Sequence, residues 1–256
     1  MTPITTNTLR EHYGRNAYSF GNPGASVTIC LIGSCRIIPF VNTLILYNSL
    51  HDHPFRLLCF NPVEMWGGPG HEVKDGVNSR LVDYRFDKVD FLVCEHIERC
   101  GVLNTVRSCE QNVFDSLGCR PEVEIRLPNW NNMHIFDAET AGYNKEYSVL
   151  APSDRVPLLR DWTMMRKNKF LRYCRTCSIP DIADWVDQNW TEIRFGWTSN
   201  HPTFELVWAM FIRVAVVIGL EKTNELLKHS DCCSGIATMP KIDLTSVDYE
   251  ANNWKY

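Results

Sequence analysis

Short apolar runs alternate with segments of helical periodicity along the first half of the chain. The runs are rich in β-branched and aromatic residues and cover residues 27–32, 55–60, 89–94 and 123–127. They are apolar almost throughout, which is typical of strands buried on both faces of a sheet. Helical patterns at residues 37–50 and 102–117 lie between them. Such alternation predicts a parallel sheet with right-handed crossovers.

Helical patterns dominate the second half of the chain. They cover residues 161–174, 179–190 and 203–220, with a shorter one at 221–229. We therefore expect an α/β fold with an open, mostly parallel sheet of about four to five strands, flanking helices and a helical C-terminal part. The predicted parts are an N-terminal arm over residues 1–25, an α/β core over 26–150, and a mainly helical part over 151–256 that packs on the core.

Composition and charge narrow the class of protein. The chain of 256 residues is 45% hydrophobic and 22% charged, as expected of a globular protein. Its net charge of −4 gives no overall basic character, so binding of nucleic acid would need a local patch. The longest apolar run, residues 204–220, is interrupted by Glu205 and Arg213. It is too short and too charged for a membrane span, and none is expected.

The chain has 11 cysteines, an odd number. It opens without the basic and apolar regions of a secretory signal, so we expect a cytoplasmic protein with mostly reduced thiols. Cys174 and Cys177 form a C-x-x-C pair at the end of a predicted helix, without the second pair that a structural zinc site usually needs. Scattered thiols are the better interpretation, and no metal is expected.

A thiol follows the first predicted strand at once, in the turn Gly33-Ser34-Cys35. The backbone N–H groups and dipole of the helix that comes next favour negative charge there, so a thiolate should form more easily. A packed cysteine in an ordinary strand–helix turn is the alternative. Ligands of open parallel sheets bind at the carboxyl ends of strands, and His96 and Asn129 follow the third and fourth strands. This convergence favours a functional Cys35.

His201 is the best candidate for a base that activates this thiol. Pro202 disfavours helical geometry at the histidine, and Thr203 can cap the helix that follows. The imidazole would then lie on a loop at a helix start, where catalytic side chains are often displayed. A histidine that only helps to cap or pack the helix is the alternative. His96, next to Glu95, could orient or polarise a substrate carbonyl.

Nucleotide-binding loops are missing from the sequence, which disfavours nucleoside triphosphate and dinucleotide cofactors. It contains no G-x-x-x-x-G-K-[ST] loop, and no G-x-G-x-x-G follows the first strand. The dense basic cluster is around Arg166, Lys167 and Lys169. It could hold a phosphorylated ligand, or it is a solvated helix face, which is the commoner case.

Four short motifs together resemble one family, the WcbI-type polysaccharide biosynthesis acetyltransferases. Residues 31–36 resemble the G-N-C-Q turn of that family, 89–96 its third-strand segment, 127–129 the segment after its fourth strand, and 198–203 its late N-H-P-[ST] motif. Order and coarse spacing agree over about residues 26–220. The resemblance implies an SGNH/GDSL-like or flavodoxin-like core, with cysteine where those hydrolases carry serine, and an association with coenzyme A.

The resemblance also implies roles for single residues. Cys35 would be the nucleophile or the thiol that contacts the acyl group, and His201 would be the base. Ser34 replaces the asparagine of the family and Arg36 its glutamine, so the roles of those two side chains are in doubt. Backbone N–H groups after Gly33 would still form an oxyanion hole. The residues expected around oxyanion and substrate are Gly33, Ser34, Arg36, His96, Asn129 and Asn200.

The function implied is transfer of an acyl group, acetyl in the first place, from coenzyme A to a hydroxyl or amine. Arg166, Lys167 and Lys169 would meet the phosphates of the coenzyme. A small molecule or a glycan is the expected acceptor, and a nucleic-acid acceptor stays open. Two alternatives remain: an SGNH-like cysteine esterase or hydrolase, and a non-catalytic module that binds coenzyme A. The sequence makes no prediction of oligomeric state.

Overall fold

The structure, a computed structural model, describes residues 17–22, 24–33, 37–52, 54–60, 88–95, 120–128, 149–198, 201–229 and 255. The chain divides into two compact units. The first unit comprises residues 1–127 and 211–237, and the second comprises 128–210 and 238–256. The boundary predicted after residue 150 rests on the sequence pattern, whereas these two units are defined by contacts between residues. The predicted boundary therefore stays a prediction.

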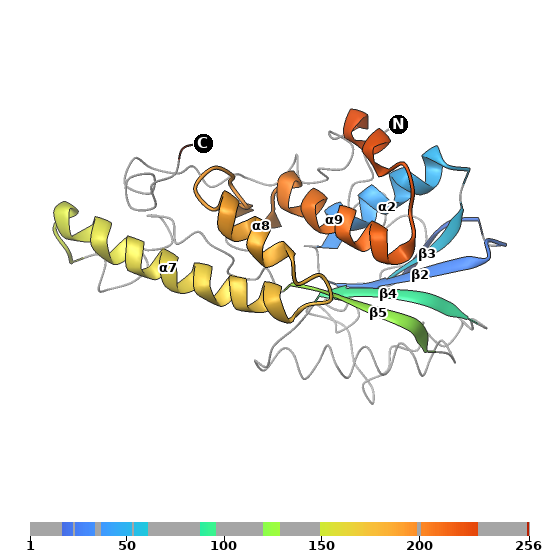
Figure 1. The fold of residues 1–256 in the computed structure, drawn as a ribbon, viewed down its shortest axis with the longest axis horizontal. Helices are drawn as coiled ribbons and strands as arrows, with labels where there is room; N and C mark the ends of the chain where they lie inside the picture. The colour runs from blue at the N-terminus through green and yellow to red at the C-terminus, as the bar shows by residue number, and fades with distance from the viewer. Residues whose placement is uncertain are drawn as a thin grey trace, which may run out of the picture. The chain divides into compact units, whose positions relative to one another are not determined.

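The first unit contains a mixed sheet. Its strands are β1 (Ala17–Gly21), β2 (Val27–Ile32), β3 (Phe55–Phe60), β4 (Val89–Glu95) and β5 (Pro121–Leu127). Their spatial order is β1-β3-β2-β4-β5, and Figure 1 labels the last four of these strands. Strands β2, β3, β4 and β5 pair in parallel, and β1 pairs antiparallel with β3. The α/β fold with a mostly parallel sheet is thereby confirmed.

The apolar runs form strands because their successive side chains point to both faces of the sheet, and both faces are buried. Ile29, Cys30 and Leu31 of the central strand β2 are completely buried, as are Leu92 and Val93 of the adjacent β4. A run without polar interruption is what a central parallel strand requires. Strands β2 and β3 have the predicted bounds, whereas β5 begins two residues earlier than predicted, at Pro121.

Strand β1 was not predicted, since residues 1–25 were expected to form an arm. Its antiparallel register with β3 runs from Ala17 opposite Phe60 to Gly21 opposite Arg56. Gly21 has a φ of +83°, and a Cβ there would lie 2.2 Å from the side-chain nitrogen of Asn48. Only glycine fits this backbone conformation and this close approach, so β1 can end against α2.

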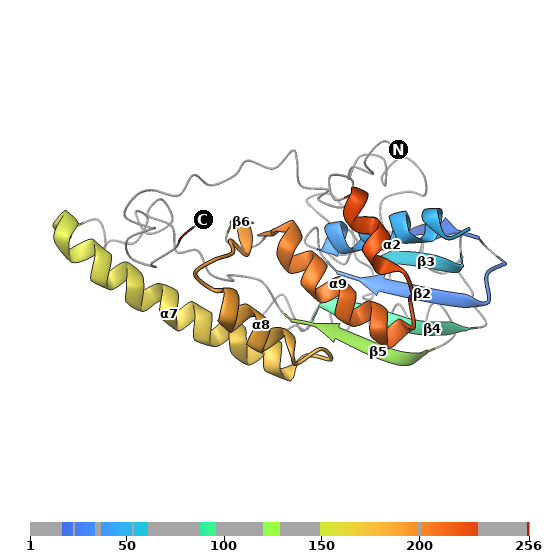
Figure 2. The ribbon, with the colours of Figure 1, turned by 45° about the horizontal axis from the view of Figure 1, so that its top comes forward.

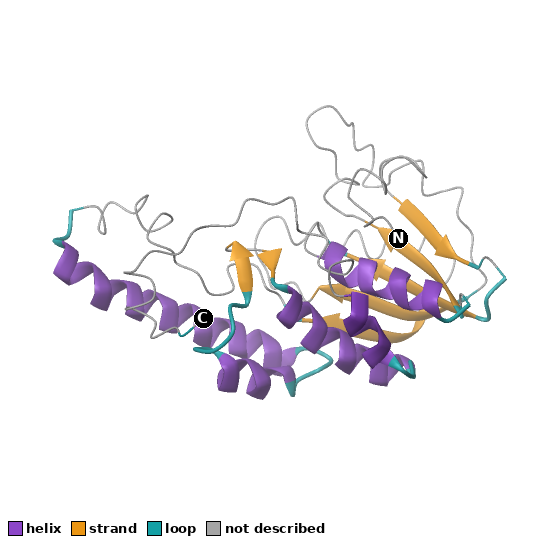
Figure 3. Cartoon of the chain, turned by 90° about the horizontal axis from the view of Figure 1, so that it is seen from above, coloured by secondary structure: helices purple, strands orange, loops and turns teal. Residues whose placement is uncertain are grey.

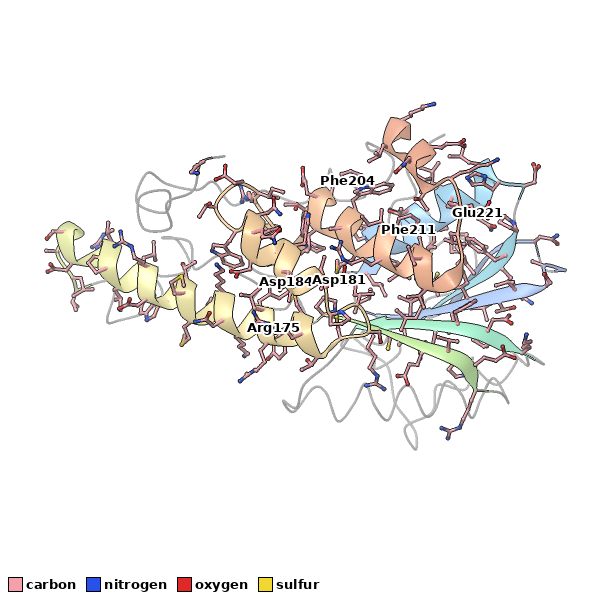
Figure 4. All side chains as sticks on the ribbon, in the orientation of Figure 1. Arg175, Asp181, Asp184, Phe204, Phe211 and Glu221 are labelled. Carbon is pink, nitrogen blue, oxygen red and sulfur yellow. The ribbon has the colours of Figure 1, made fainter. Side chains whose placement is uncertain are left out.

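Helix α2 (Ile38–Leu50) connects β2 to β3. It lies on the same face of the sheet as the part of α9 (Phe204–Ile218) that belongs to the first unit (Figures 1 and 2). The rings of Phe40 and Phe211 meet edge to face, with 5.8 Å between centroids. The hydroxyl of Tyr47 donates a hydrogen bond of 2.9 Å to the carbonyl of Glu221, just before η3 (Thr223–His229). Figure 4 labels Phe211 and Glu221.

The second unit is mainly helical in its described part. Its elements are α7 (Pro152–Thr176), α8 (Ile182–Asn189), β6 (Gly196–Thr198) and β7 (His201–Pro202), with the first half of α9 (Figure 3). Helix α7 begins nine residues before the predicted start and includes Pro157, which cannot donate a helical hydrogen bond. The ring of Phe195 contacts Trp185 and Trp190, at centroid distances of 5.6 and 5.7 Å.

The predicted helix at 102–117 lies outside the described residues. Within the residues that are described, no helix is both long and apolar enough to cross a membrane.

Candidate functional site

The sheet changes its winding direction between β2 and β4. After β2 the chain adds β3 on one side, and it then returns to place β4 and β5 on the other side. In open α/β sheets, ligands bind outside the carboxyl ends of the two strands at such a switch point. Gly33 directly follows β2 at this edge, and residue 96 directly follows β4. The switch point therefore coincides with the turn that was predicted to carry the nucleophile.

Gly33 is buried and allows the chain to fold back at once into α2. A Cβ at this position would lie 2.8 Å from Cβ and 2.9 Å from Cγ2 of Ile37. Such contacts are closer than real Cβ atoms tolerate, so the hydrogen of glycine is required. Ser34, Cys35 and Arg36, which connect Gly33 to Ile37, lie outside the described residues. The structure thus fixes the two residues on either side of the predicted tight turn, Gly33 and Ile37.

The N-terminus of α2 follows this turn with its backbone donors uncapped by the described side chains. The N-cap residue is Ile37, no hydrogen bond from a described side chain caps it, and the first turn carries no acidic residue. Pro39, in the first turn, has no N–H to satisfy. The N–H groups of the first turn and the positive end of the helix dipole favour an anion or a thiolate placed before the helix.

The other residues predicted at this edge are His96, Asn129 and Asn200, and all lie outside the described residues. His96 directly follows β4, and Asn129 comes one residue after Pro128 at the end of β5. The carboxyl ends of these strands and of β2 lie at the same edge of the sheet because all three are parallel. The grouping of the side chains stays a prediction.

The backbone at His201 is held by a short antiparallel ribbon in the second unit, whereas its side chain lies outside the description. His201 pairs with Thr198 across β6 and β7. Thr203 donates its N–H to the carbonyl of Phe195 at 2.9 Å and its hydroxyl to that of Arg194 at 2.7 Å. The hydroxyl that was expected to cap α9 therefore acts as a donor to the preceding segment. The backbone of His201 thus belongs to a short strand rather than to the predicted loop, three residues before α9 begins at Phe204, and its role as a base stays a prediction.

Lys167 belongs to the contact between α7 and α8. Its ammonium lies 2.5 Å from a carboxylate oxygen of Asp187 and 5.5 Å from the ring centroid of Trp190, and its side chain is 15% exposed. A phosphate bound there would compete with Asp187. Lys169 is exposed, with its ammonium 5.8 Å from the ring centroid of Tyr173. The role of Lys167, Lys169 and the half-buried Arg166 in phosphate binding stays a prediction.

The cysteines in the described part of the chain are buried thiols. They are Cys30, Cys59, Cys94, Cys174 and Cys177, and none is in a disulfide. Burial raises the pKa of the Cys59 and Cys174 thiols and raises that of Cys177 to about 11. The Cys177 thiol donates to the carbonyl of Cys174 at 2.9 Å. Their raised pKa values make Cys59, Cys174 and Cys177 poor nucleophiles. Across the same described residues, no group of three potential metal ligands occurs.

Comparison with known proteins supports the fold. No protein-family model matches the chain, and no curated protein matches it in sequence. A solved structure is similar to it, with a TM-score of 0.54 and 12% sequence identity, over 90% of this chain and 80% of the other. That protein is described as WcbI, a novel polysaccharide biosynthesis enzyme, in its native form without a disulfide bond between coenzyme A and one of its cysteines. At this identity the similarity shows a shared fold.

Proposed function

We propose that this chain is an enzyme that transfers an acyl group, in the first place acetyl, from coenzyme A to a hydroxyl or amine. The observation that carries the proposal is the turn after β2. It leaves the central strand at the switch point of the sheet and precedes the N-terminus of α2, which no described side chain caps. The shared fold with WcbI, whose description names coenzyme A and polysaccharide biosynthesis, supports this choice of chemistry.

In the proposed reaction, Cys35 is the nucleophile and His201 is its base. His201 accepts the proton of the thiol, and the thiolate attacks the thioester carbonyl of acetyl-CoA. Backbone N–H groups after Gly33, with Arg36 or Asn129, stabilise the oxyanion. The bond between the acyl carbon and the sulfur of the coenzyme then breaks, and the leaving thiolate takes the proton from His201. Loss of one oxyanion donor would slow this step about 10²–10³-fold.

The remaining assignments are part of the same proposal. The core would be SGNH-like, with cysteine in place of serine, and the reaction would take place in the cytoplasm. Arg166, Lys167 and Lys169 would contact the phosphates of the coenzyme, and the acceptor would be a glycan or a small molecule. The exposed ammonium of Lys169 supports this role, because no ion pair with another described residue would have to break for it to meet a phosphate.

Intact-protein mass spectrometry after incubation with acetyl-CoA tests the proposal. The wild-type chain should gain one acetyl group, and peptide mapping should place it on Cys35. Cys35→Ala should lose the adduct completely, and His201→Ala should form it much more slowly. Cys177→Ala is the matched control, since it removes a buried thiol with a raised pKa and should leave acetylation unchanged.

Other outcomes favour the alternatives. Saturable binding of coenzyme A without an adduct would indicate either direct transfer, with His201 activating the acceptor and Cys35 only lining the pocket, or a binding module. Turnover of simple thioesters or esters without affinity for coenzyme A would indicate a cysteine hydrolase. Either result would contradict acyl transfer through Cys35.

A further inference from the structure

The exposed side of the C-terminal half of α7 carries positive charge alone. Residues 162–176 include five basic side chains and no acidic one. Three of them, Lys169, Arg172 and Arg175, are exposed, and none of the three forms an ion pair with another described residue. They recur every third residue, which sets them about 4.5 Å apart along the helix axis. We call these three residues the basic stripe.

Helix α8 carries the opposite charge and packs against α7. Residues 177–193 include four acidic side chains and neither lysine nor arginine. One ion pair joins the two helices, between Lys167 of α7 and Asp187 of α8. Asp184, which Figure 4 labels together with Arg175, is exposed and has no ion pair with a described residue. The second unit therefore exposes unpaired charges of both signs on adjacent helices.

Two methionines next to the basic stripe are exposed as well. Met164 is 44% exposed and Met165 62%, and they lie on the turn of α7 before Lys169. Methionine and arginine are both enriched where proteins contact one another, because flexible thioether side chains adapt to a partner surface and guanidinium groups bind carboxylates. The composition of this side of α7 is therefore that of a protein interface.

The acidic side chains of α8 decide which class of partner fits. A nucleic acid or an anionic lipid surface would be attracted by the basic stripe but repelled by Asp184 and Asp187 on the adjacent helix. A second copy of this chain presents both signs of charge. The basic stripe of each copy can then meet α8 of the other, and a two-fold axis makes both contacts at once.

We propose that the chain forms a symmetric dimer in which the basic stripe of each copy contacts the acidic side chains of α8 in the other. Met164 and Met165 add apolar area to this contact. An exposed ion pair contributes little by itself, so association depends on several pairs, each of them doubled by the symmetry. The dimer should therefore be reversible and sensitive to salt. It is independent of the proposed acyl transfer and of the residues that would carry it out.

Sedimentation velocity of the full chain tests the dimer. Wild type should dimerise at about 50 mM NaCl, and its dissociation constant should rise about tenfold or more at about 500 mM, where charges are screened. Arg172→Glu combined with Arg175→Glu should weaken the dimer at least as much at low salt, and so should Asp184→Arg. Lys222→Glu combined with Lys228→Glu is the matched control, because it changes the net charge equally at exposed positions of the first unit. It should dimerise like wild type.

An equimolar mixture of the two kinds of stripe variant is the sharper test. In a mixed pair, the new acidic side chains on α7 of one copy face the new basic side chain on α8 of the other, and the second contact keeps its original residues. The mixture of Asp184→Arg with the double variant of Arg172 and Arg175 should therefore form a heterodimer, although each variant alone is monomeric. Far-UV circular dichroism checks that each variant is folded, and Arg172→Ala with Arg175→Ala replaces the double variant if it is not.

Several results would overturn the inference. A wild-type chain that stays monomeric at low salt, or a dimer that neither kind of variant weakens, would show that this surface does not join two copies. Folded variants that fail to associate when mixed would contradict the charge pairing. Open-ended assembly would contradict the symmetry, since a two-fold contact closes after two copies. Cosedimentation of monomeric wild type with phosphatidylglycerol vesicles, lost when Arg172 and Arg175 are replaced, would identify an anionic lipid as the occupant instead.

Discussion

At Gly33 the absence of a side chain sets the geometry of the proposed site. The residue ends the central strand and approaches Ile37 so closely that no Cβ fits between them. Because Ile37 is buried and begins α2, neither side of this contact can move freely. The close approach of Gly33 and Ile37 therefore requires glycine at position 33.

Gly33→Ala should lower the free energy of unfolding by about 1–3 kcal/mol, the usual cost of an extra methyl group in a packed site. Urea unfolding would measure this change. Gly24→Ala is the control, because the nearest atom to its Cβ is Asn22 Oδ1 at 3.5 Å, an ordinary contact, and it should have little effect. Equal stability of Gly33→Ala and wild type would show that the turn can relax.

The thiol of Cys177 makes stability depend on pH in the alkaline range. Burial raises its pKa from 9.0 to about 11. Between these two pH values the thiol is ionised in the unfolded chain but not in the folded chain. The contribution of the neutral thiol to the free energy of unfolding is therefore complete below pH 9 and is lost as pH rises towards 11. The free energy of unfolding of Cys177→Ala should therefore fall less between pH 8.5 and 11 than that of wild type. The reason is that the variant lacks the one proton that the unfolded chain releases at Cys177 and the folded chain keeps. The nearby Thr176→Ala, which removes no thiol, should keep the wild-type slope.

At the scale of elements, local patterns identified the strands better than the helix ends. Strands β2 and β3 begin and end where the apolar runs do, because central strands need apolar residues on both faces. The start of α7 was misplaced because Pro157 normally interrupts a helix, yet here the helix continues from Pro152. Strand β1 was missed because a short edge strand gains its hydrogen bonds from a partner and carries little pattern of its own.

Asn48 connects α2 to β3 and offers a test at this scale. Its side chain donates to the carbonyl of Phe55 at 2.9 Å and accepts from the N–H of Phe55 at 3.1 Å, and all these groups are buried. Asn48→Ala should cost about 1–3 kcal/mol for each buried group left without a partner. Chemical unfolding would measure it. The neighbouring Ser49→Ala, which loses a half-buried hydrogen bond to the Ile45 carbonyl, should cost much less; similar losses in both variants would contradict the argument.

At the scale of the whole molecule, the order of strands determines where a ligand can bind. The reversal between β2 and β4 leaves the carboxyl ends of these two strands open at the switch point, and Gly33 directly follows β2 there. Gly33 alone would not suggest a site, since glycine turns are common. The order of the strands is what makes an acyl-transfer site at this turn a specific proposal.

Binding of coenzyme A should stabilise the whole chain, by about 2.7 kcal/mol at a hundred times its Kd. Asp187→Asn frees Lys167 from its ion pair, so a coenzyme that uses Lys167 should protect this variant more strongly than wild type. Thermal unfolding with and without coenzyme A would measure the difference. Asp184→Asn on the same helix is the control (Figure 4). Equal protection of Asp187→Asn and wild type would show that Lys167 serves only the contact between α7 and α8.

The sequence by itself determined the α/β class, the four parallel strands and the turn that places Cys35 after the first of them. These features follow from burial on both faces and from one tight turn, and both are local properties of the chain. Only the tertiary structure decided that β1 joins the sheet beside β3 and that Lys167 pairs with Asp187. Each of these depends on pairing between segments far apart in sequence, where periodicity carries no information about register.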